Sequence, residues 1–214
     1  MDLTQPTGNT VTVNIDDESY HIHENLLMKD MDFFGTFQAH GSIFVDEEPD
    51  VFDAFVQWLY ARHFIKNPSI EVALKLWTFG HRISCHKLQN CVMDYIQDYY
   101  LFNRECMEVA EVKYIFREAP ALRSENVLQI FCVAQLHYQA TQDMEYASVR
   151  DILLEVTAVV GSYLRFECDN LSDIVDCNPK YRGPREGRWC TFHIHDPGNE
   201  KDCAMKPNDD DDPS

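Results

Sequence analysis

Residues 20–34 read Tyr-His-Ile-His-Glu-Asn-Leu-Leu-Met-Lys-Asp-Met-Asp-Phe-Phe and decide the fold of this 214-residue chain. The segment opens with polar and apolar residues alternating over Tyr20–His23, which predicts a short strand. A helical pattern follows, with Leu26, Leu27 and Met31 on one face and Phe33-Phe34 at its end. We therefore expect a corner at which a strand turns directly into helix, to about Gln38.

Three residues of this corner carry a family resemblance. His23 ends the strand, Leu27 follows four residues later, and Phe34 follows eleven residues after His23. This spacing resembles the core signature of BTB/POZ domains, in which these residues define the fold. Two positions depart from the family pattern, because Met31 stands where the family usually has Ser and Glu24 where a basic residue is common.

Later blocks extend the resemblance in the family's order. Phe52, Phe55, Trp58, Leu59 and Tyr60 resemble its F-x-x-F/L-L-x-W/Y-L-Y helix. Leu74–Cys85, followed by Leu88 and Asn90, resembles the helix pair that comes next. The match covers roughly residues 9–100, about half of the chain, and its general style is similar to BTB proteins of filamentous fungi.

The resemblance implies an α+β protein with a BTB/POZ fold, a small sheet flanked by helices. We expect a disordered N-terminus at 1–8, a BTB/POZ domain at 9–102, a helical extension packed on its end at 103–167, and an irregular Cys/His-containing tail at 168–214 whose acidic end is disordered. Family members self-associate or recruit protein partners, and some are substrate adaptors for cullin-type ubiquitin ligases. The scaffold contact of the family implies exposed partner-binding candidates here, namely Asp53, Gln57, Tyr60, Arg62 and His63; an ordinary solvated helix face explains the same pattern equally well.

The rest of the chain follows the same kind of pattern reading. Alternation predicts strands at 11–15 and 42–45, the first forming a hairpin with Tyr20–His23. Apolar stripes at helical spacing predict helices at 49–61, 70–83, 88–99 and 104–118, one from an N-cap at Ser124, and a long one over 149–163. Pro120 separates two of them. We expect the three helices of the second half to pack on one another and on the BTB end.

Composition excludes several classes of partner. The chain carries 36 acidic and 18 basic residues, a net charge of −18. Binding to nucleic acid or to anionic membranes needs local positive charge, so neither is expected. One basic cluster, Lys180, Arg182, Arg185 and Arg188, fits a solvated loop better than a phosphate contact. With no leader-like segment and no apolar run near 20 residues, we expect an intracellular, cytoplasmic or nuclear protein without disulfides.

The sequence offers little sign of catalytic chemistry. It contains no dinucleotide-binding, Walker-type or nucleophile-elbow glycine pattern. His23 fits a packed corner residue better than a general base. His81 and His86 lie five positions apart around Cys85, a spacing that does not share a helical face, so a surface role is favoured. Phe33, Phe34, Trp58, Tyr60 and Trp77 fit a core. We expect a non-enzymatic protein; the competing hypothesis is an enzymatic or metal-dependent activity centred on the tail.

The tail admits three interpretations. Cys190, His193, His195 and Cys203 form Cys-x2-His-x-His-x7-Cys, with Cys168 and Cys177 as spare ligands, and four such ligands suit a structural zinc ion. Such a site would make the protein a zinc-stabilised regulatory or scaffold protein without ligase recruitment. Residues 189–195 alternatively form a docked edge strand, with Cys190, Phe192 and Ile194 inward and His193 and His195 toward solvent. Disorder is the third interpretation.

Assembly is the last expectation from sequence. Many BTB domains dimerise through their first helices and add a swapped N-terminal strand. Only about ten polar residues precede Val11 here, so material for that extra strand is missing. We expect a monomer or a weak dimer.

Overall fold

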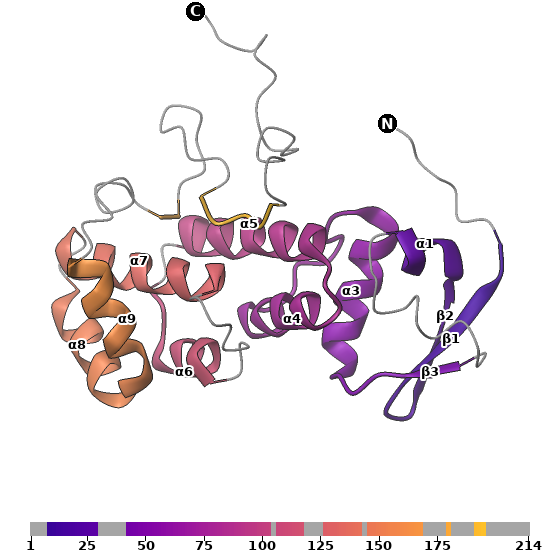
Figure 1. Ribbon diagram of the computed structural model, residues 1–214, viewed down its shortest axis with the longest axis horizontal. Coiled ribbons are helices and arrows are strands. Elements are labelled where there is room, and N and C mark those ends of the chain that lie inside the picture. The colour runs from indigo at the N-terminus through magenta and orange to yellow at the C-terminus, as the bar shows by residue number, and fades with distance from the viewer. Residues whose placement is uncertain are drawn as a thin grey trace, which may run out of the picture. The chain divides into compact units, whose positions relative to one another are not determined.

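The computed structural model is an α+β fold with a small mixed sheet and many helices (Figure 1). The structure describes residues 8–29, 42–103, 106–117, 126–142, 145–168, 179–180 and 191–195. The chain forms two compact units, unit 1 from Met1 to Val92 and unit 2 from Met93 to Ser214, and the division falls within helix α5.

Three strands form the sheet of unit 1, in the order β2-β1-β3. β1 (Thr10–Ile15) and β2 (Glu18–His23) make an antiparallel hairpin in which Val13 opposes Tyr20. Its two-residue turn contains Asp16 at φ 47°, a left-handed conformation that Asp tolerates well. β3 (Ser42–Phe44) runs parallel to β1. The predicted strands and hairpin are confirmed.

The corner after β2 forms as expected over its described part. α1 (Glu24–Lys29) begins directly after His23, and the backbone N–H of Glu24 donates to the carbonyl of Asn9 at 2.9 Å. Leu26 and Leu27 are buried. Met31, Phe33 and Phe34, which complete the predicted signature and helix, lie outside the described residues.

Two helices supply most of the core of unit 1. α3 (Pro49–Ala61) starts with Pro at a position that needs no backbone donor, and α4 (Ile70–Arg82) starts at Ser69, whose hydroxyl accepts from the N–H of Val72 at 3.2 Å. The inward stripes of both helices carry buried aromatic residues. Four of them pack together, and these are Phe52, Phe55, Trp58 and Phe79, while Trp77 stacks on His81.

α5 (His86–Asn103) follows α4 after a sharp turn at Ser84, which has φ 54°. The helix starts before and ends after its predicted range, 88–99. Gly80 permits the close approach of the two helices, because a Cβ at this position would lie 3.0 Å from Cγ of Gln89. α5 is 18 residues long but carries charged side chains along its length. None of the helices in the described part of the chain combines the length and the apolar character of a membrane-spanning segment.

Unit 2 is built around α7 (Val127–Thr141), which is buried on nearly all sides. α6 (Val109–Arg117), α8 (Tyr146–Glu155) and α9 (Thr157–Cys168) pack against it, as predicted for the second half of the chain. The side chain of Asn126 caps α7 by accepting from the N–H of Gln129 at 2.9 Å. The predicted cap, Ser124, lies outside the described residues, and the capping role belongs to Asn126.

The single long helix predicted over 149–163 is wrong. The structure divides this range into α8 and α9 at Val156, which leaves the helical region with φ −112° and ψ 73°. Val156 is buried, as are Val149 and Ile152 before it and Val159 and Phe166 after it. The break lets both short helices turn their apolar sides inward, which the helical periodicity alone did not reveal.

Candidate partner-binding surface

Asp53 lies on the outer side of α3 and faces the hairpin of unit 1. The hydroxyl of Tyr20 lies 3.0 Å from Asp53 Oδ1 and 2.7 Å from Glu18 Oε2, and the two carboxylates share its single proton. Burial and these two carboxylates raise the pKa of Tyr20 well above its usual range. Asp53 is exposed, as predicted. Its carboxylate also accepts from Tyr20 and so ties α3 to the strand β2.

Tyr60 joins the end of α3 to the corner. Its hydroxyl accepts from the backbone N–H of His23 at 3.2 Å and lies 2.8 Å from His23 Nδ1. The bond fixes the half-buried His23 ring, while 42% of Tyr60 stays exposed. Trp58 and Trp77, grouped with Tyr60 as core residues, are buried.

The turn after α3 is held in a defined conformation. Arg62 adopts φ 61° and ψ 13°, and its N–H donates to the carbonyl of Trp58 at 2.7 Å. Its guanidinium lies 4.8 Å from the Trp58 ring, a cation–π distance. Gln57 Oε1 accepts from the N–H of Lys66 at 3.1 Å, and His63 Nδ1 donates to the carbonyl of Ala61 at 2.8 Å. Arg62 and His63 remain exposed on this ordered turn, while Gln57 is half-buried.

Pattern reading missed Ile65, which is 74% exposed on the same turn. No acidic residue occurs between Asp53 and Glu71, whereas Arg62, His63 and Lys66 do. In a chain with a net charge of −18, this is a basic turn around an apolar side chain. The sequence does show an apolar residue between basic residues in a loop, which could have indicated this surface. Helical periodicity does not detect it, because that pattern selects only residues on the faces of helices. We call Tyr60, Arg62, His63 and Ile65 the α3 surface.

The tail residues follow a different arrangement from the predicted edge strand. Residues 191–195 form a turn and an irregular segment. Phe192 points inward, as predicted, and meets the Phe131 ring edge-on at a centroid distance of 5.2 Å. His193 was expected to face solvent but is buried, and its Nε2 donates to Asp94 Oδ1 on α5 at 2.8 Å. The strand prediction is therefore wrong over this range. His193 is buried because its hydrogen bond to the Asp94 carboxylate compensates for the loss of contact with water.

The zinc hypothesis stays a prediction. Cys177, Cys190 and Cys203 lie outside the described residues, and Cys168 ends α9 as an exposed thiol. The ring centroids of His193 and His195 lie 5.9 Å apart. Within the described ranges, no three His, Cys, Asp or Glu side chains come together as a metal site would require. Metal analysis of untagged protein tests the hypothesis; zinc below about a tenth of an equivalent, with chelator leaving Tm unchanged, would exclude it.

The predicted basic cluster is only partly visible. Lys180 is buried, which contradicts its placement in a solvated loop. The neighbouring Pro179 carbonyl accepts from Gln97 Nε2 at 2.7 Å, so this tail segment is held against α5. Arg182, Arg185 and Arg188 lie outside the described residues.

Two hydrogen-bonded pairs of titratable side chains occur in unit 2, and each gives a buried polar group its hydrogen-bond partner. The Tyr100 hydroxyl donates to Glu111 Oε2 at 2.8 Å, and His137 Nδ1 donates to Glu167 Oε1 at 2.7 Å. Burial, followed by Glu167, raises the pKa of Tyr163 to about 12. Burial also raises the pKa of Cys132 far above its usual range, which keeps this thiol protonated and unreactive. These groups fit structural roles in a helical core.

Comparisons with protein-family models, with curated proteins and with solved structures find no match for this chain.

Proposed function

We propose that the chain is a non-enzymatic protein–protein interaction module that binds a partner through the α3 surface. The observation that carries the proposal is Ile65, an apolar side chain held exposed on an ordered, basic turn. Interface centres combine an apolar or aromatic anchor with Arg, and Tyr60, Arg62 and Ile65 provide these types close together in the sequence. The turn is fixed before binding, so little conformational entropy is lost on association.

A BTB/POZ identity of unit 1 belongs to the same proposal. The order of elements supports it: a hairpin, a strand-to-helix corner with His23 and Leu27, the strand β3, and an aromatic helix. Residue spacing supports it as well, since Phe52, Phe55 and Trp58 point inward from α3 as the resemblance implies. BTB domains that resemble this unit recruit protein partners, and the partner proposed here is a cullin-type ubiquitin ligase scaffold.

Affinity purification of the full chain from its native host, followed by mass spectrometry, tests the proposal. We expect a cullin among the recovered proteins, and Ile65→Ser to reduce its recovery by at least about tenfold, as for an interface hot spot. Phe102→Ser is the matched control, because Phe102 is 76% exposed in unit 2. Equal losses in both variants, or no cullin with the unmodified chain, would contradict the proposal.

The proposed assembly state is a monomer or weak dimer. The net charge of −18 on each chain opposes self-association. Light scattering over nanomolar to micromolar concentrations measures it. A tight dimer at nanomolar concentration would overturn this expectation.

A further inference from the structure

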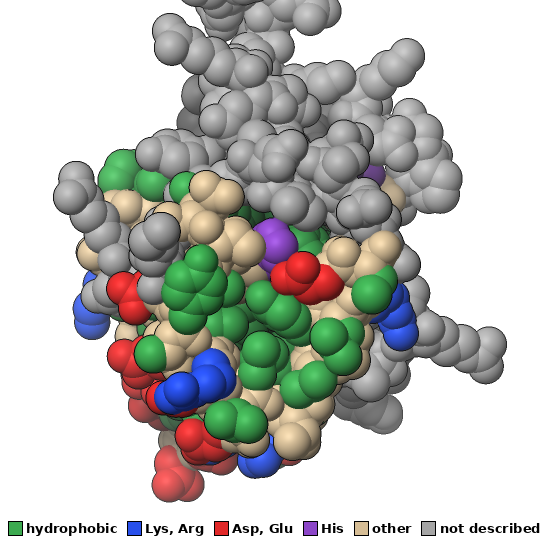
Figure 2. Space-filling view, turned by 90° about the vertical axis from the view of Figure 1, so that its left-hand side faces the viewer, with side chains coloured by type: hydrophobic (Ala, Val, Ile, Leu, Met, Phe, Trp, Pro, Cys, Tyr) green, Lys and Arg blue, Asp and Glu red, His purple; other side chains and the backbone are tan. Residues whose placement is uncertain are grey.

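Exposed apolar side chains occur in both units, and they differ in what the backbone beside them offers. Figure 2 shows hydrophobic side chains gathered on an outer face of unit 2, where the structure describes mainly helices, whose backbone hydrogen bonds are made within each helix. Phe44, which is 79% exposed, lies instead on the strand β3 of unit 1. A strand with a free edge can pair with a further strand, so the backbone beside Phe44 can also bind.

The outer edge of β3 is open. Among the described strands, β3 pairs only with β1. The backbone N–H of Val45 donates to the carbonyl of Asn14 on β1 at 3.1 Å. Because successive backbone groups of a strand point to opposite edges, the N–H and carbonyl groups of Ser42 and Phe44 point away from β1. Within the part of the chain that the structure describes, no hydrogen bond reaches these groups.

The opposite edge of the sheet, on β2, is less suited to binding. The N–H of His23 at the end of this strand already donates to the hydroxyl of Tyr60 at 3.2 Å. The exposed residues that precede it along β2, Ser19 and His21, are polar. A strand added to β2 would displace the Tyr60 contact and would find no exposed apolar side chain on β2. The edge of β3 has neither drawback.

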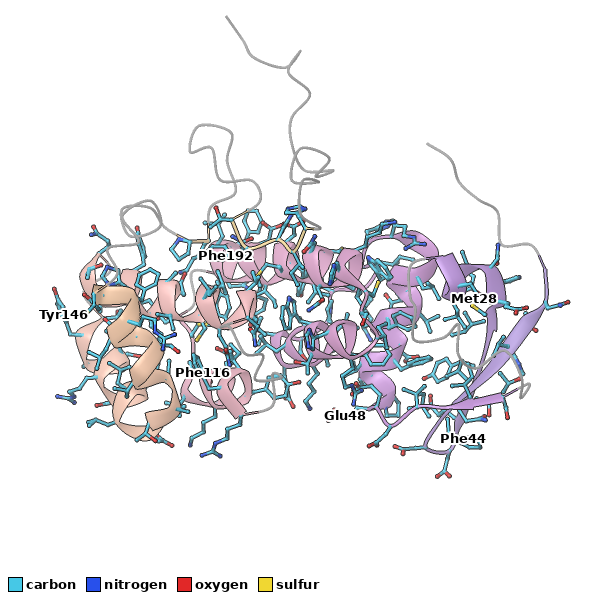
Figure 3. All side chains as sticks on the ribbon, viewed as in Figure 1. Met28, Phe44, Glu48, Phe116, Tyr146 and Phe192 are labelled. Atoms are coloured by element: carbon cyan, nitrogen blue, oxygen red, sulfur yellow. The ribbon has the colours of Figure 1, made fainter. Side chains whose placement is uncertain are left out.

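Phe44 differs in kind from the other side chains on its face of the sheet. On this face, Thr12 Oγ1 lies 3.2 Å from His21 Nδ1, and the Ser19 hydroxyl donates to Asn14 Oδ1 at 2.7 Å. Phe44 is in register with Asn14, so its described cross-strand neighbour is polar. Figure 3 shows Phe44 at the rim of unit 1. An apolar residue of an added strand would cover its ring, because aromatic and β-branched side chains on adjacent strands pack together.

The charge around β3 favours a basic partner. The three strands contain no Lys or Arg. The hairpin turn Asp16-Asp17 lies at the same end of the sheet as Asp46, because β1 and β3 are parallel, and all three carboxylates belong to exposed residues. Arg82 donates to the carbonyl of Asp46, but its charge is paired with Glu47. This excess of carboxylates repels a second copy of the same edge and attracts Lys or Arg of another protein.

We propose that the outer edge of β3 binds an extended, basic segment of a partner protein, which adds to the sheet as an antiparallel strand. The N–H and carbonyl groups of Ser42 and Phe44 pair with the backbone of this segment, and one of its apolar side chains covers the Phe44 ring. Antiparallel addition places the N-terminal end of the segment beside Asp46, so its Lys or Arg residues precede its apolar residues. Because β3 has three residues, the contact is short and binding is weak and reversible. The inference goes beyond the function proposed for the α3 surface and does not depend on it.

A designed peptide tests the edge with the full-length protein. The probe is Lys-Lys-Val-Thr-Val-Thr-Val with blocked ends, whose valines can lie beside Phe44. In an antiparallel pair, the residues that share the face of Phe44 are those whose N–H groups point to β3. N-methylation of every Val therefore removes the pairing donors, whereas N-methylation of every Thr keeps them, with charge and side chains unchanged in both peptides.

Titration followed by ¹⁵N–¹H spectra gives the affinity and locates the contact. We expect a dissociation constant on the order of hundreds of micromolar for the probe and for the Thr-methylated peptide. The Val-methylated peptide should bind at least about tenfold more weakly, because it cannot make the backbone hydrogen bonds. Shifted amide signals should fall on β3 and on the hairpin turn beside it.

Protein variants separate strand addition from general attraction to an acidic chain. Phe44→Ser should weaken binding of the probe about three- to fivefold, and Phe102→Ser, at a 76% exposed position of unit 2, less than about 1.5-fold. Ser42→Pro removes an outward N–H without removing a bond to β1 and should weaken binding at least about fivefold, whereas Ser42→Ala should not. Asp46→Asn should lower both the affinity and its salt dependence. Ile65→Ser should leave binding unchanged, which distinguishes this edge from the α3 surface.

Several results would overturn the proposal. These are no binding of the probe, equal binding of the two methylated peptides, equal effects of the Phe44 and Phe102 variants, or shifted signals away from β3. Light scattering that shows a dimer of the unmodified chain, abolished by Ser42→Pro, would also overturn it, because a second copy would then occupy the edge. Each variant must retain the Tm of the unmodified chain. The methylated peptides test the pairing on the unmodified chain, so the proposal stays testable if Ser42→Pro does not fold.

Discussion

The interiors of the two units differ in kind. Unit 1 is filled by an aromatic cluster in which Phe55 contacts Phe52 and Phe79 at centroid distances of 5.3 and 5.2 Å. Among its described residues, Gln89 is the single buried polar side chain. Such a core depends on volume and shape, because dispersion and apolar burial supply nearly all of its stabilisation.

Unit 2 buries many more polar groups. Its described buried polar residues are Gln97, Asn126, Gln135, His137, Gln139, Lys180 and His193. Some are paired, as His193 is with Asp94, whereas the amides of Gln135 and Gln139 have no hydrogen-bond partner in the structure. Stability here depends on whether each polar group is satisfied. Substitutions that remove a polar contact should therefore matter more in unit 2 than in unit 1.

Leu27→Asp should have the largest effect. Leu27 is fully buried in the apolar corner, and an unpaired charge there costs several kcal/mol, a large part of the total stability of a domain. We expect loss of the cooperative unfolding of unit 1, measured by circular dichroism and calorimetry. Asn25→Asp, on the exposed side of α1, is the control and should fold normally. A soluble Leu27→Asp protein with unchanged helicity and a cooperative transition would refute the placement of the corner.

His193→Ala should have the next largest effect, through a polar contact. The side chains of His193 and Asp94 are 2% and 15% exposed, so the variant removes a bond to a largely buried carboxylate. We expect a loss of about 2–3 kcal/mol in the free energy of unfolding, measured in urea. In an Asp94→Asn background the same change should cost less, and this double-mutant cycle gives the coupling energy. A loss below about 0.5 kcal/mol would mean that the His193–Asp94 contact contributes little to the stability of unit 2.

Gln139→Met should stabilise unit 2. Both amide atoms of Gln139 are buried and lack a partner, and Met is similar in length but needs none. We expect a gain of about 1 kcal/mol in the free energy of unfolding. Gln142→Met, at an exposed position, should change stability by less than about 0.5 kcal/mol. A loss above about 1 kcal/mol would show that ordered water satisfies the Gln139 amide.

The same difference explains what the sequence could predict. In unit 1, alternation found β1, β2 and β3, and apolar periodicity found α3 and α4. These elements bury continuous apolar stripes, so the pattern and the packing agree. The exposed positions Asp53, Arg62 and His63 followed from the same periodicity.

The features that were not predicted do not depend on a repeating pattern of apolar residues. Val156 looks helical in sequence, and its departure from the helix depends on which neighbours it packs against. His193 looks exposed because His usually is, yet its position is set by Asp94, 99 residues earlier in the chain. Ile65 belongs to a loop, where no repeating pattern exists. Non-local pairing and loop geometry thus limited the prediction of the site more than that of the fold.

The smallest predicted effect concerns pH and His81, a rare titratable group at the aromatic core of unit 1. Its ring stacks parallel to Trp77, with 3° between the planes and 6.2 Å between the centroids. Burial, and to a lesser degree the nearby His86, lowers the pKa of His81 below its ordinary value of 6.5. Between the lowered pKa and 6.5, the unfolded chain therefore binds more protons than the folded chain.

This difference in proton binding gives the sign of the effect. The stabilisation associated with neutral His81 is fully present above pH 6.5 and is lost as the pH falls through the lowered pKa of the folded state. Replacing the residue in His81→Gln removes this dependence, so the Tm of the unmodified chain minus that of the variant should fall between pH 7.5 and 5.5. His81 is only half-buried, and solvent screening limits the change to about 1–2 °C. His86→Gln should shrink the change without abolishing it, because it removes the second cause and leaves burial. A difference that stays constant or grows toward pH 5.5 would mean that the Trp77 stack holds the charged ring as readily as the neutral one.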